Sequence, residues 1–398
     1  MLDSFIALDL ETTGLRPETD EIIEVGAVRF ENEHPADEYH TLVNPLRSIP
    51  EAIQRLTGIS PKELATAPSF EHVAAQVASF LGSTPLAGHN LAFDLSFLAA
   101  KGVRPTGPVL DTYHLASLLF PQSQEYNLVY IARLCGLILP SEHRALNHAS
   151  VTGTVLLELR KKIDSLPALI KEEIARLGKL AGAGWHLLFS PSQISPSPLT
   201  LNLLLPSLSR LPELEIEPLE PKDNPTPVPV ESLVRMLEPG GAIQSALPGF
   251  EHRPEQVQMA RAVAEAINQG QQLIVEAGTG TGKSMAYLLP AMSFALDNQS
   301  RIVLSTNTIN LQEQLVNKDI PLLKQALNHL SGLKVTTLKG RSNYLCPLRW
   351  DSLRQSLVLS HEEALFLAKT LIWLSHTQTG DKAELHLLAN EASVWNGV

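Results

Sequence analysis

The sequence predicts an α/β protein of two domains joined by a proline-rich connector. In residues 4–160 strand patterns and helix patterns alternate, as is typical of α/β domains. Ten of the 28 prolines fall between Pro191 and Pro229, which favours an extended linker. From about residue 247 the α/β alternation returns. We therefore expect a first domain at 1–165, a helical connector and linker at 166–245, and a second α/β domain at 246–398.

The individual elements follow from apolar periodicity and from the turn residues that separate them. In the first domain the patterns predict strands at 4–10, 21–30, 39–43, 85–88 and 109–111 and helices at 70–81 and 91–101. Residues 166–188 have the apolar spacing of a helix. In the second domain we expect helices at 254–269, 284–296 and 309–327, and strands at 272–276 and 301–306.

Composition limits the class of protein. A chain of 398 residues is long enough for two or three domains with separate cores. Its net charge of -11 argues against a protein that coats nucleic acid, although carboxylates that hold metal ions would account for part of this charge. Two cysteines make no disulfide framework, and no apolar run approaches the roughly 18 residues of a membrane span. We expect a cytoplasmic protein without a membrane partner.

Two acidic residues stand out near the amino end. Asp9 and Glu11 lie two positions apart in an apolar strand pattern, so both side chains project from the same face. Paired carboxylates suit Mg²⁺ or Mn²⁺, and two such ions about 4 Å apart can activate water at a phosphodiester. Two acids at a solvated strand end by chance are an equally good explanation of this pair alone.

Three segments together carry a resemblance. FIALDLETTGL at 5–15, GHNLAFDLSFL at 88–98 and HRALN at 143–147 resemble, in this order, the motifs of the DEDDh exonucleases, the family of the bacterial proofreading subunit. The segment LTGIS at 56–60 is also similar to that family. The resemblance implies a ribonuclease-H-like fold over about 4–160 and removal of nucleotides from a 3′ end.

The same resemblance implies roles for single residues. Asp9, Glu11 and Asp94 would hold two ions, Mg²⁺ or Mn²⁺. His143 would be the general base, a task that suits a side chain titrating near neutrality. Thr12 and Thr13 would contact the terminal nucleotide, and ordering of the turn is an equally good role for them.

His148 departs from the family pattern. The family places a fourth acidic metal ligand five residues after the histidine, and His148 stands at that position. Imidazole is neutral and matches Mg²⁺ poorly, so affinity for the second ion should fall. Three hypotheses remain open: an enzyme with altered metal preference, a weakened enzyme, and an inactive domain that binds single strands.

A glycine-rich segment carries the signal of the second domain. AGTGTGKS at 277–284 lies between an expected strand and an expected helix, where backbone N–H groups can cradle phosphates. Lys283 should reach the β and γ phosphates of ATP, and Ser284 should bind Mg²⁺. Ala277 replaces the usual first glycine, which is a mild departure.

The surroundings of this loop resemble the DinG branch of superfamily 2 helicases. The similar segments are RPEQ at 253–256, LSTNT at 304–308, LQEQ at 311–314 and KGRSNYLC at 339–346. The resemblance implies a P-loop (RecA-like) helicase lobe in which Gln256 recognises adenine and Thr306, Asn307 and Thr308 lie near the nucleic-acid backbone. The expected ATP-binding residues are Gln256, Ala277, Gly278, Thr279, Gly280, Thr281, Gly282, Lys283 and Ser284.

Some helicase features are missing from the sequence. No Asp-Glu pair follows Lys283, although ATP hydrolysis needs acids that position Mg²⁺ and water. We therefore expect a partial lobe, truncated before a second motor lobe. Cys346 stands where iron-sulfur relatives place a first cluster cysteine, and no cysteine follows it, so a cluster is not expected within this chain.

The leading hypothesis is a fusion of a 3′-to-5′ exonuclease and an ATP-dependent DNA helicase that acts in DNA repair or replication. Its expected partners are ATP and single-stranded or 3′-ended DNA. The alternatives are a scaffold that binds nucleic acid and ATP without activity, and an ATPase of another class with an unrelated first domain. The sequence leaves DNA against RNA and the oligomeric state open.

Overall fold

The computed structural model describes residues 2–137, 144–189, 218–247 and 249–398. The chain forms two compact units. The first combines Met1–Leu211 with Arg341–Val398, and the second is Pro212–Gly340. This division differs from the expected boundaries, because the segment expected as one domain at 246–398 is divided after residue 340.

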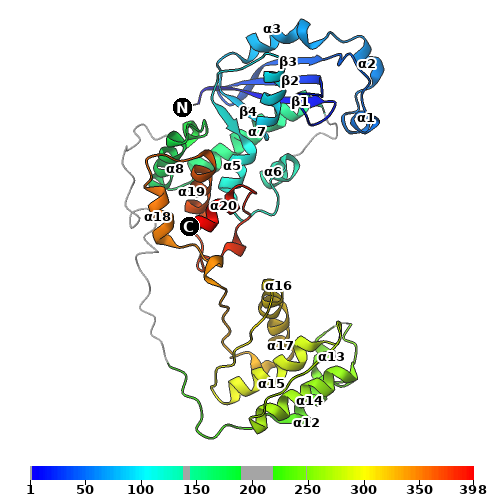
Figure 1. Ribbon diagram of the computed structural model, residues 1–398, viewed down its shortest axis with the longest axis vertical. Helices are drawn as coiled ribbons and strands as arrows, with labels where there is room; N and C mark the ends of the chain where they lie inside the picture. The colour runs from blue at the N-terminus through cyan, green and yellow to red at the C-terminus, as the bar shows by residue number, and fades with distance from the viewer. Residues whose placement is uncertain (1, 138–143, 190–217, 248) are drawn as a thin grey trace. The chain divides into compact units, whose positions relative to one another are not determined.

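A five-stranded mixed sheet forms the centre of the first unit (Figure 1). Its strands are β1 (Ser4–Thr12), β2 (Ile22–Glu31), β3 (His34–Leu42), β4 (Leu86–Gly88) and β5 (Val109–Asp111). The spatial order is β3-β2-β1-β4-β5, with β1, β2 and β3 antiparallel and β4 and β5 parallel to β1. All five strands were expected from the sequence, and the mixed sheet has the ribonuclease-H-like arrangement.

Helices complete the first unit. Those that precede the linker are α1 (Glu51–Thr57), α2 (Pro61–Ala65), α3 (Phe70–Leu81), α4 (Ala92–Ala100), α5 (Thr112–Leu119), α6 (Leu128–Leu134), α7 (Ala145–Asp164), α8 (Ala168–Leu180) and α9 (His186–Phe189). Three more come from the end of the chain: α18 (Pro347–Arg354), α19 (His361–Leu374) and α20 (Glu391–Gly397). Among the described residues, no helix is both long and apolar enough to span a bilayer.

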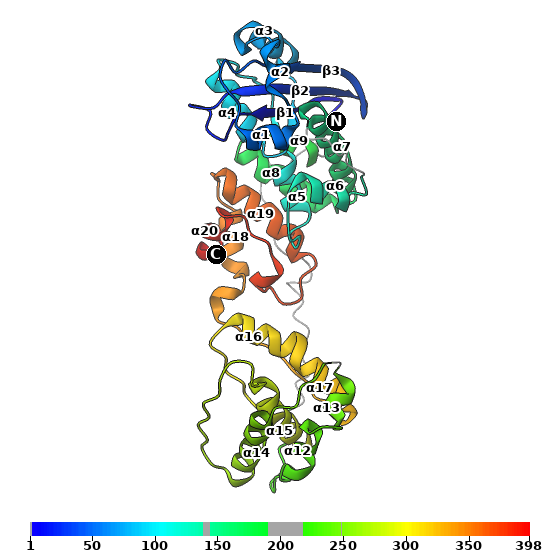
Figure 2. The same cartoon turned by 90° about the vertical axis from the view of Figure 1, so that its right-hand side faces the viewer.

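Strand β1 is buried on both faces because its side chains alternate. Ile6 and Leu8 share a core with α3 and α4 on one face. Phe5 and Ala7 belong to a second core, which includes residues of α5 and α7 on the other face (Figure 2). Odd-numbered side chains of β1 therefore point toward α7, and this alternation decides where the two acidic residues lie.

The second unit is helical among its described residues. Its α-helices are α12 (Val230–Leu237), α13 (Ala242–Ala246), α14 (Pro254–Gln269), α15 (Lys283–Asp297), α16 (Ile309–Gln314) and α17 (Ile320–Ala326), with a π-helical turn at Leu315–Asp319. Helices were expected over the region of α14 to α17 but not at α12 and α13, and the strands predicted at 272–276 and 301–306 do not form. A strand needs a neighbour that takes up its backbone hydrogen bonds, and these segments pair with none in the described chain.

Candidate metal centre and nucleotide loop

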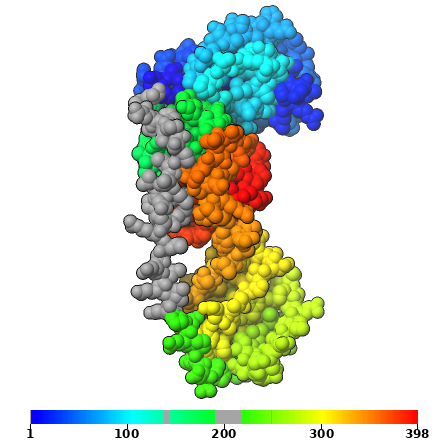
Figure 3. Space-filling model, turned by 60° about the vertical axis from the view of Figure 1, so that its left-hand side comes forward, coloured from blue at the N-terminus to red at the C-terminus, as the bar shows by residue number. Residues whose placement is uncertain are grey.

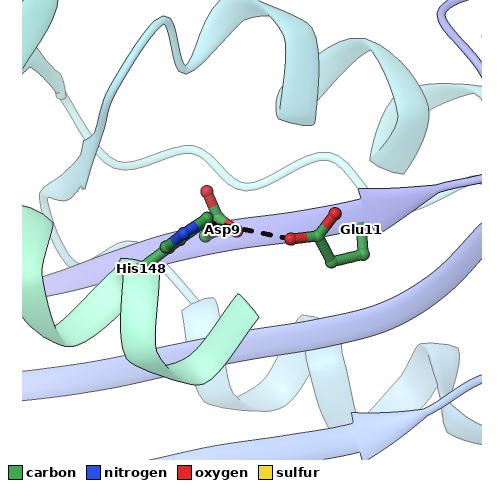
Figure 4. A group of neighbouring side chains, drawn as sticks. All are labelled: Asp9, Glu11 and His148. Carbon is green, nitrogen blue, oxygen red and sulfur yellow. Dashed lines mark ion pairs between the residues drawn. The ribbon is translucent and has the colours of Figure 1, made fainter. Parts of the chain in front are cut away.

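The metal-binding candidates begin with β1. Asp9 and Glu11 follow Phe5 and Ala7 on the face of the strand that points toward α7, and their side chains are 23% and 14% exposed. His148 projects from the first turns of α7 into the same place (Figure 4). Its Nδ1 lies 3.6 Å from Asp9 Oδ2 and 3.8 Å from Glu11 Oε1. One ligand atom from each residue lies within 4.8 Å of the others, a spacing that allows a shared metal ion.

Asp94 completes the acidic group from a different element. It lies in the first turn of α4, is 5% exposed, and its Oδ1 accepts a hydrogen bond of 2.9 Å from the backbone N–H of Leu10. Leu10 stands between Asp9 and Glu11, so the carboxyl group of Asp94, which is far from both in sequence, joins theirs at one end of β1. Helix α4 is itself held by Asp111, whose carboxylate accepts from the N–H groups of Asn90 and Leu91.

Crowding disfavours the charged forms of these carboxyl groups. Burial, and then repulsion from Glu24, hold the pKa of Asp9 well above its usual range. Burial, and then the Asp9 charge, raise the pKa of Glu11 to about 8. The pKa of Asp94 is also raised, by burial and then by Asp9. A divalent cation would reverse each effect by neutralising the repulsion, so the donor set fits a hard cation.

Glu24 on β2 fixes the start of α7 and therefore the position of His148. Its side chain is fully buried, and it accepts hydrogen bonds from Ala145 N at 3.0 Å, Arg144 Nε at 2.9 Å and His40 Nε2 at 2.6 Å. Burial raises the pKa of Glu24, but the hydrogen bonds from Arg144, Ala145 and His40 lower it further, leaving it below its usual value. Glu24 was not among the expected site residues, although an acid inside the apolar run of β2 is an unusual signal.

Gly26 lets α7 lie directly against the sheet. It pairs with Asp9 in the register of β1 and β2. A β-carbon at position 26 would lie 2.2 Å from Leu146 N and 2.3 Å from the carbonyl carbon of Ala145. Because these are backbone atoms of a helix, they cannot move aside as a flexible side chain would. Position 26 therefore needs glycine, because only then can α7 lie close enough to the sheet to bring His148 to Asp9 and Glu11.

The remaining residues expected at the first site have local roles or lie outside the described chain. Thr12 donates from Oγ1 to Gly14 O at 2.6 Å, and Thr13 Oγ1 accepts from Glu21 N at 2.9 Å. Both contacts order the turn after β1. His143 falls in 138–143, outside the described residues.

The glycine-rich loop begins α15 as expected. Lys283 is the first residue of the helix, and its Nζ donates to the loop carbonyls of Ala277 at 2.8 Å and Gly278 at 2.7 Å. Gly280 and Gly282 have φ angles of 84° and 77°, which favour glycine. The loop therefore has the backbone conformation that its glycines predict.

Gln256 is brought to the same loop from α14. It is 3% exposed, and its Nε2 donates to Gly282 O at 2.9 Å. The other expected residues contact one another: Thr306 Oγ1 donates to Thr308 O at 3.1 Å, and Thr308 caps α16 by accepting from Leu311 N. The structure thus joins Gln256 to the glycine-rich loop, while the contacts of Thr306 and Thr308 are local to the start of α16.

Comparisons with known proteins match an exonuclease family and a helicase family in separate parts of the chain. Residues 6–156 match the family model "Exonuclease", and residues 256–367 match the family model "DEAD/DEAH box helicase". A protein of Bacillus subtilis named "3'-5' exonuclease DinG" is 31% identical over 98% of this chain and 42% of its own length. A protein of the same name from Staphylococcus saprophyticus is 28% identical over 96% of this chain and 42% of its own length.

The solved structure of exonuclease X in complex with 5′ overhanging duplex DNA is 25% identical, covering 40% of this chain and 90% of that chain at a TM-score of 0.34. The chain spans less than half the length of the curated relatives it matches. An exonuclease match is followed by a helicase match, and the chain is homologous over nearly its full length to proteins named 3′-5′ exonuclease DinG.

Proposed function

We propose that the first unit removes nucleotides from the 3′ end of single-stranded or 3′-ended DNA, and that the chain also binds ATP. The convergence of Asp9, Glu11, Asp94 and His148 at one end of β1 carries the proposal. The names of the relatives support the direction of cleavage.

The acidic residues suit this reaction chemically. Asp9, Glu11 and Asp94 would hold Mg²⁺ or Mn²⁺, which when bound supplies an activated water and neutralises charge at the phosphodiester. Bound positive charge would favour the ionised forms of these carboxyl groups, since burial and mutual repulsion raise the pKa of each. His143 would accept the proton of the attacking water, as the family resemblance implies.

His148 makes the metal preference of the site specific to this chain. Its imidazole faces Asp9 and Glu11 from the position where the resemblance expects a carboxylate. One negative charge fewer should weaken Mg²⁺ binding most, since Mn²⁺ accepts imidazole more readily. A nucleic-acid-binding scaffold without cleavage is the second candidate function, and the same histidine favours it.

The first prediction separates these two functions. A 3′-labelled single strand should be shortened faster with Mn²⁺ than with Mg²⁺, and His148→Asp should raise the Mg²⁺-dependent rate by about tenfold or more, because it restores a hard anionic ligand. Product lengths on a denaturing gel give both rates. Asp94→Asn serves as the inactive control.

Absence of shortening with Mn²⁺, together with no gain from His148→Asp, would reject the exonuclease in favour of the scaffold. Shortened strands that keep the 3′ label would show removal from the 5′ end, and the proposed direction would then be wrong.

The second prediction concerns ATP. Lys283→Ala should weaken ATP binding by about tenfold or more, since a charged contact to phosphates is removed. Isothermal titration of the full chain measures this affinity. Lys318→Ala, in the π-helical turn that follows α16, is a matched removal of a lysine outside the loop and should leave the affinity unchanged. Equal ATP affinities for the Lys283→Ala and Lys318→Ala proteins would contradict the assignment of the phosphate loop.

A further inference from the structure

The last part of the chain, residues 341–398, folds in the first unit. The helicase family match extends to residue 367, so α18 and the first half of α19 belong to that match by sequence. In space they belong to the unit that contains the exonuclease match. Figure 3 shows these residues, in orange and red, against cyan and green atoms of the same unit.

A common apolar core joins this segment to residues 2–189 of the same unit, which are called the exonuclease region here and extend beyond the exonuclease match at 6–156. The core combines residues of α5 and α8 with Trp350, Phe366, Leu367, Leu371 and Trp373 of the segment. Helix α19 contacts both α5 and α8. Every residue of α19 from Ala364 to Leu374 is buried. A helix buried on all sides stays folded only while its neighbours cover it, so the contact is a packed interface and not a surface touch.

Buried charges link the two sides of this core. Arg354 of α18 is 0% exposed, and its Nη1 lies 2.7 Å from Glu173 Oε1 of α8. Arg176 of α8 pairs with the same Glu173 and also donates from Nη2 to the carbonyl of Arg354 at 2.8 Å. Removing Arg354 would break the ion pair that crosses this core and leave the buried Glu173 with Arg176 alone, which costs more than losing an exposed ion pair.

A second polar contact lies on the loop between α5 and α6. His386 donates its backbone N–H to Pro121 O at 2.9 Å, and its Nδ1 lies 2.9 Å from Ser123 O. Its ring lies 5.0 Å from that of Tyr126, which is itself buried. The segment is thus held at two separate places, α8 and the 120–126 loop, which fixes its orientation as well as its position.

We propose that residues 341–398 are a docking element that binds the exonuclease region non-covalently, with α5, α8 and the 120–126 loop as the receiving surface. This interface then anchors part of the helicase-matching sequence to the exonuclease region, in addition to the covalent continuity of the chain. This inference is independent of the nuclease activity, because it depends only on packing and ion pairing.

The proposal is tested by cleaving the chain after residue 200 and measuring whether the two fragments remain associated. A recognition sequence for a specific protease is inserted after residue 200 of the full chain, and the cleaved protein is run on a size-exclusion column at micromolar concentration. Both fragments should elute as one complex. Elution of two separate fragments from the cleaved, otherwise unaltered protein would overturn the proposal.

Variants then test the buried ion pair. Arg354→Ala should raise the dissociation constant of the cleaved halves by about 30-fold or more, because it removes the buried ion pair between Glu173 and the docking element and leaves Arg176 as the arginine partner of Glu173. Arg261→Ala is the matched control, since Arg261 pairs with Glu231 on the exposed surface of the second unit. Equal dissociation constants for the two variants would overturn the role of Arg354.

Glu173→Gln is a gentler second variant should Arg354→Ala not fold. It keeps the shape of the side chain and removes its charge, and it should also weaken the complex. Complexes as tight as that of the unsubstituted protein would contradict the ion-pair anchor.

Discussion

Glu24 shows how a single buried residue can place a site to which it contributes no ligand atom. It lies opposite Glu11 in the register of β1 and β2, and it accepts the backbone N–H of Ala145 at the first residue of α7. His148 follows one turn later in the same helix. The Glu24 carboxylate therefore sets the distance between the imidazole and the acidic pair, through a helix rather than by direct contact with it.

Replacing Glu24 by glutamine should show whether Glu24 positions α7 and His148 for metal binding or only stabilises the fold. Glutamine replaces one of the two acceptor oxygens by an N–H₂ donor and removes the charge that holds Arg144 and His40, so α7 should shift and Mn²⁺ affinity should fall by about tenfold or more. Calorimetric titration with Mn²⁺ measures this change. Glu173→Gln is the control, because Glu173 is equally buried and arginine-paired but contacts α18, not α7.

Two outcomes are informative. If both variants lose thermal stability but only Glu24→Gln loses Mn²⁺ affinity, Glu24 is a positioning residue. If Mn²⁺ affinity is the same in both, its role is structural only.

At the scale of elements, the contact between β2 and α7 decides whether the site can exist. Two glycines allow it. Gly26 of β2 lies under the first turn of α7, and Gly153 of α7 lies against the ring of Phe30, where a β-carbon would be 2.1 Å away. The strand and the helix therefore approach each other closely at two points along α7, which fixes the helix in both position and tilt.

Gly26→Ala should disrupt this contact. The added methyl group would overlap backbone atoms of Ala145 and Leu146, so we expect a loss of about 3 kcal/mol or more in the free energy of unfolding, or loss of Mn²⁺ binding if the helix moves away instead. Denaturant unfolding and Mn²⁺ titration measure the two effects. Gly332→Ala has open space around it and should change neither. A stable Gly26→Ala protein with unchanged Mn²⁺ affinity would show that the approach is less close.

In the second unit, apolar sequence patterns did not predict the strands correctly. Residues 272–276 and 301–306 have strand-like apolar patterns, yet Ile274 is 98% exposed and Val303 is 81% exposed. The helices around them form because their hydrogen bonds are local, whereas a strand depends on a partner elsewhere in the chain. Helix prediction therefore succeeded in this unit, and strand prediction was wrong.

At the scale of the whole molecule, the tryptophans report on only one of the two units. All four, Trp185, Trp350, Trp373 and Trp395, are buried in the core of the first unit. Three of them come from the docking element, residues 341–398, and one from the exonuclease region. Their fluorescence should therefore follow the unfolding of both parts of this core together.

Thermal unfolding followed by tryptophan fluorescence should show one transition, and Mn²⁺ should raise its midpoint temperature. We expect this although the carboxylate ligands lie on β1 and α4 and most of the tryptophans lie in the docking element. Binding to the folded state alone stabilises the whole cooperative unit. The increase in midpoint temperature caused by Mn²⁺ should be larger at pH 7.5 than at pH 6. The folded pKa of Glu11 is about 8, against an unfolded value of about 4.3, so the metal-free fold loses stability as pH rises through this window.

Mn²⁺ reverses that loss by favouring the ionised carboxylates, and for this reason its effect should grow with pH. Glu11→Gln should remove most of the pH dependence. If Mn²⁺ does not change the midpoint temperature of the tryptophan transition, the docking element unfolds separately from the metal site.

The local sequence pattern determined several elements of this protein. The alternation of β1 predicted a buried strand that aims Asp9 and Glu11 the same way, and the glycines of the 277–284 loop predicted its turn and the start of α15. These features depend on neighbours a few residues away, so a linear pattern contains them.

Tertiary structure decided what depends on distant partners. The convergence of Asp94 with the acidic pair followed from the three-motif resemblance, but the hydrogen bond from Leu10 that holds Asp94 there did not. Glu24 as the support of α7, the need for glycine at position 26, and the packing of 341–398 on α5 and α8 have no local signature. Each is a contact between residues more than 100 positions apart or between separate elements, and only the folded chain brings such groups within van der Waals reach.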